Sequence, residues 1–146
     1  MAKRARWVGL VLVLVGAWAA FDLLVTSDRE QVEAIAGAFR GEVSNARLQA
    51  ALAHVDVDVQ PLETRVRGTT RVYGRGAAGD LARDARRRLA PLSGARFRPL
   101  QERIEVDGDD AEVQMRLVSE AGTGTLRLRL RKHDARWLLR ALEVQR

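Results

Sequence analysis

The side chains that most often carry catalytic or metal chemistry are scarce in this chain. Its 146 residues include two histidines, His54 and His133, and no cysteine. Without thiolates there is neither a cysteine nucleophile nor a cysteine-based metal site. A zinc or iron centre would need carboxylates for most of its ligands. We therefore expect no bound metal, and we interpret His133, beside Asp134, as a residue of a turn.

Arginine supplies most of the positive charge and is unevenly distributed. The formal net charge is +6, and residues 65–103 carry eleven basic and three acidic side chains, whereas residues 26–63 carry three and seven. Arginines of two strands are candidates for a cationic binding surface, although such residues are more often the solvated side of a sheet. Interleaved acidic residues and few aromatic residues argue against a nucleic-acid partner. The candidate binding residues are Arg71, Tyr73, Arg75, Arg127, Arg129 and Arg131.

The glycines Gly74, Gly76 and Gly79 have the spacing of a dinucleotide-binding loop. That motif needs a strand that returns parallel after the helix and an acidic residue for the ribose. Neither is evident, because the strands expected downstream form hairpins. We interpret the glycines as a strand-to-helix turn and expect no cofactor.

The N-terminal 25 residues predict a membrane anchor. Lys3, Arg4 and Arg6 precede the apolar segment 7–25, which as a helix would approach the roughly 30 Å of a bilayer core. Basic residues lie before the segment and are sparse just after it, which places the N-terminus in the cytoplasm. We expect a single-pass protein of the inner membrane, whose residues 26–146 are periplasmic or otherwise extracytoplasmic.

A cleaved signal peptide is the competing interpretation of the same segment. The triplet Ala17-Trp18-Ala19 has small residues at the spacing of a cleavage site. Against cleavage, apolar residues continue through Phe21 and Leu23 to Val25, beyond the point where a signal peptide turns polar.

Residues 26–146 have the pattern of one α+β domain. Ser27 and Glu30 form a capping-box pattern, and the apolar spacing continues from Val32 to Val43. A second helix is expected after a cap at Asn45, and a third over residues 78–89.

Alternation of apolar and polar residues predicts the strands. The first runs over residues 55–59 and ends at Pro61; the second runs over residues 64–75, with a bulge at Gly68. A meander of antiparallel strands follows from Arg96 to the C-terminus. Its first turn contains Asp107-Gly108, for which we expect a type I′ turn.

These elements resemble the nuclear transport factor 2-like superfamily and its cystatin-like roll. The residues that carry the resemblance are Val32-x-x-Ile35-Ala36-x-x-Phe39, Leu48-x-x-x-Leu52, the stretch 105–113, and Leu128-x-Leu130-x-Lys132 with Trp137-Leu138-Leu139. The resemblance implies a cone of three helices on a curved antiparallel sheet, as in membrane-anchored members of unknown activity.

Catalytic members of that superfamily hold a general base and a tyrosine inside the cone, so the resemblance makes His54, Asp56, Asp58 and Tyr73 candidate catalytic residues. None matches a catalytic motif. We expect a non-catalytic domain for protein assembly or binding at the membrane surface, as a homodimer or with another protein. The alternative is a small apolar-ligand binder, or an acid–base isomerase or dehydratase, that uses the cone cavity.

Overall fold

Ser27 begins the first described helix, as its capping-box pattern predicts. The computed structural model describes residues 27–146, and helix α2 spans Asp28–Gly37. The Ser27 hydroxyl accepts a hydrogen bond from the Glu30 amide (3.2 Å), and the Glu30 carboxylate accepts one from the Ser27 amide (2.9 Å). Two backbone donors that have no partner in the first turn of a helix are thereby satisfied.

The other helices lie close to where the sequence predicts them. Helix α3 spans Asn45–Leu52, capped by Ser44 and not by Asn45, because the Ser44 hydroxyl accepts from the Arg47 amide. Helix α4 spans Ala78–Leu89 and continues into the 3₁₀ turn η1, Ala90–Leu92. Helix α2 ends earlier than expected, and the short strand β1 (Gly41–Glu42) follows it.

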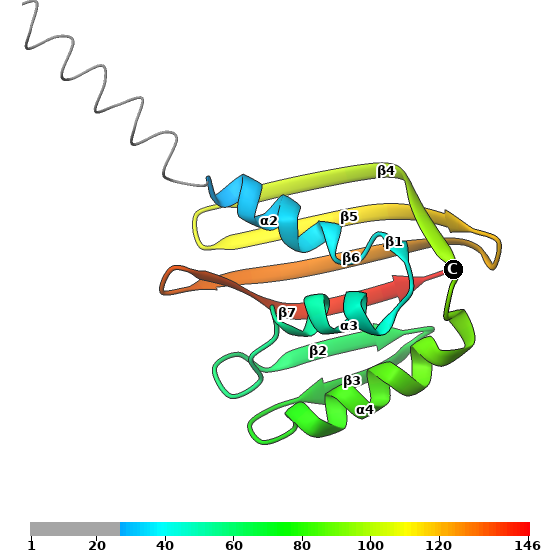
Figure 1. The fold of residues 1–146 in the computed structure, drawn as a ribbon. Helices are drawn as coiled ribbons and strands as arrows, with labels where there is room; N and C mark the ends of the chain where they lie inside the picture. Colours follow the sequence, from blue (N-terminus) through cyan, green and yellow to red (C-terminus); the bar gives the residue numbers. More distant parts are fainter. Residues whose placement is uncertain (1–26) are drawn as a thin grey trace, which may run out of the picture.

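Within residues 27–146, seven strands form one sheet in the order β1-β4-β5-β6-β7-β2-β3 (Figure 1). Each pair of neighbours is antiparallel except β2 and β7, which are parallel, so the sheet is mostly and not wholly antiparallel. The expected C-terminal meander is confirmed. The strands besides β1 are β2 (Leu62–Val66), β3 (Thr69–Tyr73), β4 (Arg96–Asp107), β5 (Asp110–Ser119), β6 (Gly122–His133) and β7 (Arg136–Gln145).

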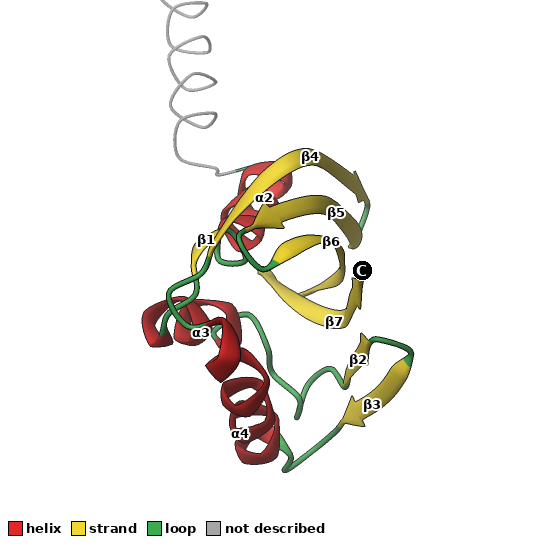
Figure 2. Ribbon diagram, turned by 90° about the vertical axis from the view of Figure 1, so that its right-hand side faces the viewer, coloured by secondary structure: helices red, strands yellow, loops and turns green. Residues whose placement is uncertain are grey.

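The sheet is strongly curled, and helices α2, α3 and α4 lie on one side of it (Figure 2). Strand register puts Met115 opposite Leu126, and Val113 opposite Leu128, on the face that the helices cover. Val32 of α2 is completely buried there, as are Met115 and Leu128. The core therefore lies between the helices and the inner, concave face of the sheet, and the outer face is left to solvent.

The strand expected over residues 55–59 is wrong. These residues form a turn, because the Asp56 carboxylate accepts hydrogen bonds from the Asp58 and Val59 amides and the Asp56 carbonyl accepts from the Gln60 amide. Such local bonds compete with strand pairing. Val57 is 3% exposed and packs into the core from this turn, so its apolar character did not indicate a strand.

The single strand expected over residues 64–75 is also wrong. It is the hairpin of β2 and β3, with Arg67 and Gly68 as its two turn residues. Both have positive φ, 51° and 81°, as a type I′ turn requires. At the next predicted hairpin, Gly108 has positive φ and Asp109 does not, so that turn is not the expected type I′.

The predicted membrane anchor, residues 7–25, lies outside the described residues. Within residues 27–146, no helix has the length and apolar character needed to cross a membrane.

Candidate functional site

The inside of the roll, which the resemblance makes the first candidate site, is filled by apolar side chains. Met115, Leu128 and Leu130 are 0% exposed and Trp137 is 3% exposed. Among residues 27–146, no charged residue, amide or histidine belongs to the buried set, and its side chains with a polar group are Tyr73 and Trp137. Catalysis inside the cone would require an acid or base among these buried residues.

Two hollows of the described surface lie on the outer face of the sheet. One, of about 10 Å³, is lined by residues of β2, β6 and β7, among them Arg65 and Arg127. The other, of about 40 Å³, lies beside it and is lined by Gln114, Arg127 and Glu143, among others. Pockets for small ligands commonly measure about 300 Å³ or more, so these hollows are too small for such a ligand.

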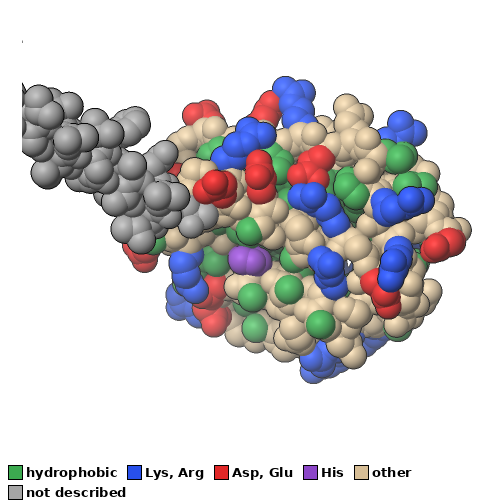
Figure 3. Space-filling view, turned by 45° about the horizontal axis from the view of Figure 1, so that its top comes forward, with side chains coloured by type: hydrophobic (Ala, Val, Ile, Leu, Met, Phe, Trp, Pro, Cys, Tyr) green, Lys and Arg blue, Asp and Glu red, His purple; other side chains and the backbone are tan. Residues whose placement is uncertain are grey.

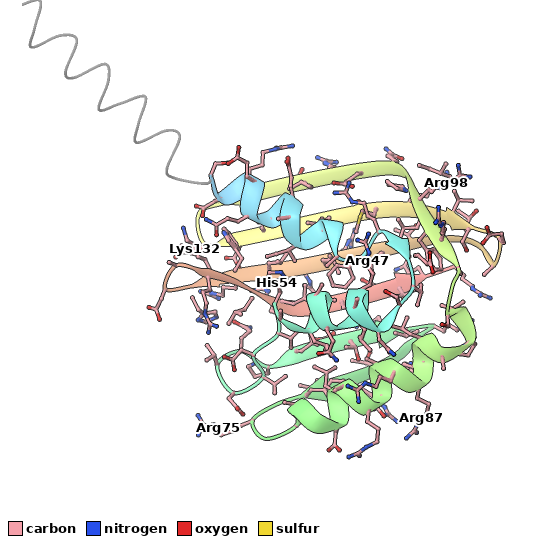
Figure 4. The ribbon with its side chains drawn as sticks, viewed as in Figure 1. Arg47, His54, Arg75, Arg87, Arg98 and Lys132 are labelled. Atoms are coloured by element: carbon pink, nitrogen blue, oxygen red, sulfur yellow. The ribbon has the colours of Figure 1, made fainter. Side chains whose placement is uncertain are left out.

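His54 lies just after α3 and is half-buried. Its carbonyl accepts a hydrogen bond from the Leu139 amide (2.8 Å), which ties the end of α3 to β7. Burial lowers the pKa of the His54 imidazole, because a charged ring loses hydration there. Figure 4 shows His54 on the helix side of the sheet.

Asp56 and Asp58 hold backbone turns together. In addition to its turn, Asp56 accepts from Arg136 at 3.4 Å, and Asp58 accepts from the Gly76 amide at 2.8 Å. The second contact joins the turn after α3 to the glycine loop before α4. This gives the glycine spacing a structural explanation as a turn.

Tyr73 belongs to a polar cluster with Asp84 of α4 and Arg71 of β3. Its hydroxyl donates to Asp84 Oδ2 (2.7 Å), and Arg71 Nη1 donates to the same oxygen. The hydrogen bond from Tyr73, together with the Arg71 charge, lowers the pKa of Asp84, while burial and the bond to Asp84 raise the pKa of Tyr73. A tyrosine already donating to a carboxylate is not available to polarise a carbonyl.

The four candidate catalytic residues are thus not brought together around one cavity. His54 and Asp56 lie near β7, Asp58 contacts the glycine loop, and Tyr73 contacts α4. Each has a structural partner, and their catalytic role stays a prediction.

The expected cationic surface is divided between two faces of the sheet. Arg127, Arg129 and Arg131 alternate with the buried leucines of β6 and therefore point outward. Arg71 lies on the face of Tyr73 and reaches α4. The outer arginines have acidic neighbours: Glu112 is paired with Arg127 at 3.2 Å. On the helix side of the domain, which Figure 3 shows, acidic and basic side chains are also interspersed.

One cluster has no counterpart in the sequence-based candidates. Asp28 Oδ1 accepts hydrogen bonds from Lys132 Nζ (2.7 Å) and from Trp137 Nε1 (3.1 Å). Those bonds lower the pKa of Asp28. The cluster joins the first turn of α2 to β6 and β7, and Asp28 is more than a hundred positions from both Lys132 and Trp137 in the chain. The one signal in the sequence is an acidic residue in a first helical turn.

His133 lies at the end of β6, paired with Arg136 across a tight turn, and its ring contacts the Gln60 side chain. Within residues 27–146, no group of three or more histidine, aspartate or glutamate side chains is arranged to hold a metal ion.

Several solved structures share the fold of this chain. A protein of unknown function with a cystatin-like fold from Nostoc punctiforme matches 83% of this chain and 92% of its own, at 17% identity and a TM-score of 0.62. A proposed dehydratase of the NTF2-like family from Streptomyces avermitilis matches 80% and 94%, at 16% identity and a TM-score of 0.61. A proposed ketosteroid isomerase from Shewanella frigidimarina matches 82% and 95%, at 16% identity and a TM-score of 0.60.

No protein-family model matches the sequence, and no curated protein matches it. At these identities the structural likeness shows the fold alone. It supports the expected fold: residues 27–146 form an α+β, cystatin-like roll with helices α2, α3 and α4 and a curled, mostly antiparallel sheet. Because the same fold carries many unrelated functions, activity must be argued from this chain's own residues.

Proposed function

We propose that this protein is a non-catalytic domain that binds a protein partner at a membrane surface. Residues 7–25 tether it as a single span of the inner membrane, and residues 26–146 lie on the extracytoplasmic side. Binding takes place on the outside of the sheet, with a second copy or with another protein.

The observation that carries this proposal is the filled interior. Met115, Leu128 and Trp137 are buried inside the roll, where the resemblance places the ligand of catalytic members. The small apolar-ligand binder and the acid–base isomerase or dehydratase both need that space, and no observation favours them over a binding domain. The surfaces left for function are the outer face and the edges of the sheet.

The tether is supported by the sequence. Residues 7–25 contain eleven Leu, Val or Phe residues and one charge, Asp22, three residues from the end of the segment. Those eleven residues contribute about −3 to −7 kcal/mol to insertion, against about +3 kcal/mol for an aspartate at the centre of a helix. An aspartate near the end costs less, because it reaches the headgroup layer.

The absence of cysteine makes the topology simple to test. Single-cysteine variants Lys3→Cys and Glu120→Cys are expressed separately and treated with a membrane-impermeant maleimide, in spheroplasts and after lysis. Glu120 is exposed in the turn between β5 and β6. We expect labelling of Glu120→Cys in spheroplasts and of Lys3→Cys after lysis only. The reverse pattern contradicts the proposed topology, and a mature chain that starts near residue 20 contradicts the tether.

Protein binding is tested by placing a photoreactive residue at Arg129, on the outer face, and in separate variants at other exposed positions of the sheet. After irradiation of intact membranes, we expect a cross-linked product with a defined protein or with a second copy. If every position gives the uncross-linked chain alone, the domain does not bind a protein and the proposed function fails.

A further inference from the structure

Strand β3 is the last strand of the sheet at the end opposite β1. A two-residue turn connects its partner β2 to β3, so Val66 and Thr69 form a hydrogen-bonded pair next to that turn. Hydrogen-bonded pairs alternate with non-hydrogen-bonded pairs along an antiparallel ladder, so the backbone groups of Arg71 and Tyr73 also face β2. The N–H and C=O groups of Thr70 and Val72 therefore face away from the sheet.

The pairing of β2 with β7 supports this geometry independently. The amide of Arg67 donates to the Val144 carbonyl (3.4 Å), so the odd-numbered residues of β2 turn their backbone groups toward β7. The even-numbered residues turn theirs toward β3, as the hairpin requires. Two donors and two acceptors on β3 are left at an edge that pairs with no further strand in residues 27–146.

One side chain on this edge, that of Val72, is unusual for a solvated strand. Val72 is 66% exposed, and it lies on the outer face of the sheet opposite Glu63. A new strand beside β3 would cover Val72 with its own outward-pointing side chains, which favours an apolar residue at that place.

The inner face of the same edge is positively charged. Arg71 is half-exposed even though it is paired with Asp84. Arg87 is near enough to lower the pKa of Asp84 further, and Arg86, Arg87 and Arg88 are exposed on α4. Figures 1 and 2 show α4 beside β3 on the helix side, and in Figure 4 Arg75 and Arg87 point away from the domain.

We propose that β3 binds an extended acidic segment of a partner protein, which adds to the sheet as a further strand. Its backbone pairs with Thr70 and Val72, an apolar side chain covers Val72, and its carboxylates face Arg71 and Arg87. This mode of recognition combines backbone affinity with side-chain specificity. A second copy of this chain would bring the same arginines to the edge, so like charges disfavour it. A lipid surface has no backbone to pair with the strand.

This inference rests on the proposed function and names the chemistry of the partner. The probe is a dye-labelled, blocked peptide, Glu-Val-Glu-Thr-Glu-Val-Glu, titrated with the full chain in lipid nanodiscs at low salt and followed by fluorescence anisotropy. We expect a Kd of the order of 100 µM. Two control peptides are expected to bind at least tenfold more weakly: one with lysine in place of glutamate, and one with N-methylated backbone amides.

The backbone contribution is tested at Thr70. Proline in Thr70→Pro removes an amide that points away from the sheet and leaves the pairing with β2 intact, as prolines on edge strands do. The matched control Thr70→Ala removes the side chain and keeps the amide. We expect Thr70→Pro to abolish peptide binding, with an unchanged circular dichroism spectrum, and Thr70→Ala to bind within about twofold of the native chain.

The charge contribution is tested at Arg87, with Arg98 as the matched control. Both arginines are exposed, and Figure 4 places Arg98 on β4, at the far side of the domain. Arg87→Glu is expected to weaken binding by about threefold to tenfold at low salt, and Arg98→Glu by much less.

Four outcomes overturn the proposal: no binding to the native chain, equal binding to Thr70→Pro, equal effects of Arg87→Glu and Arg98→Glu, or disulfide-linked dimers from Val72→Cys in intact membranes. The last outcome would make the occupant a second copy. If the peptide fails while photo-cross-links from Arg129 persist, the edge is not the site and the proposed function stands.

Discussion

Replacing Met115 by alanine tests whether the inside of the roll is filled. Met115 is 0% exposed on the concave face, and it lies opposite Leu126 of β6. The substitution removes three heavy atoms from the core. At about 0.8 kcal/mol for each methylene-sized group, the lost transfer free energy is roughly 2.4 kcal/mol. A cavity that relaxes only partly adds about 1 kcal/mol or more, so the expected loss of stability is about 3 to 4 kcal/mol.

The assay is urea unfolding of the full chain in a mild detergent, followed by far-UV circular dichroism. Leu100→Ala is the matched control, because Leu100 is 61% exposed on β4. Its free energy of unfolding should change by less than about 0.5 kcal/mol. A small apolar molecule such as benzene should restore part of the stability of Met115→Ala, since a new apolar cavity inside a core can bind one.

A loss below about 1 kcal/mol in Met115→Ala would refute the reasoning. It would mean that Met115 already borders empty space, as it would in a roll with an open ligand cavity. The ligand-binding and acid–base alternatives would then regain the space that they require.

Three further changes test the polar contacts that hold the roll together. Ser27→Ala removes the cap of α2 and should lower the free energy of unfolding by about 1 kcal/mol; an unchanged urea midpoint would mean that the cap contributes nothing. Burial lowers the pKa of His54, so the unfolded chain binds a proton more readily just below pH 6.5, and stability should fall as the pH falls through that range. His54→Asn should remove this part of the pH dependence, and an identical slope in the variant would assign it elsewhere. The bond from Tyr73 lowers the pKa of Asp84 below 3.8, so the stability that ionised Asp84 contributes should be present above that pH and lost below it. Asp84→Asn should not show this loss of stability during acid unfolding. An acid-unfolding profile identical to that of the native chain would contradict the assignment to Asp84.

Elements whose apolar and polar residues alternate regularly over their whole length were predictable from the sequence. Val113, Met115 and Leu117 alternate with polar residues over a full strand, and the structure buries all three. The capping box at Ser27 was equally informative, because a cap acts within four residues and needs no tertiary contact. The fold class follows from such segments.

The turn at residues 55–59 was not predictable from alternation, because alternating valines and aspartates fit both a strand and a turn held by aspartate side chains. Val55, Val57 and Val59 alternate with aspartates, as in a strand. An aspartate can also bond the amides two and three residues ahead, and Asp56 does so here. The local bonds prevail, because Val57 reaches the core from the turn.

The candidate sites were harder to predict, since contacts between distant residues decide them. The sequence places Tyr73 among arginines, which is correct for Arg71, but it does not show that both donate to Asp84 on the next helix. Asp28, Lys132 and Trp137 give no common signal in the chain and still form one cluster. The parallel pairing of β2 with β7 was likewise missed, and it decides which strand becomes the edge.

The two edges of the sheet differ in a way that argues for function on one of them. At the first edge, β1 pairs with the start of β4, Arg29 of α2 donates to the Ile104 carbonyl (3.5 Å), and Arg40 is paired with Glu102. Such covering is how proteins protect an edge strand from unwanted pairing. Strand β3 has no comparable cover within residues 27–146, and it exposes Val72 on its outer face and has the arginines of α4 on its inner side. Because the interior is closed by Met115 and its neighbours, this edge is where the fold leaves backbone groups for a partner.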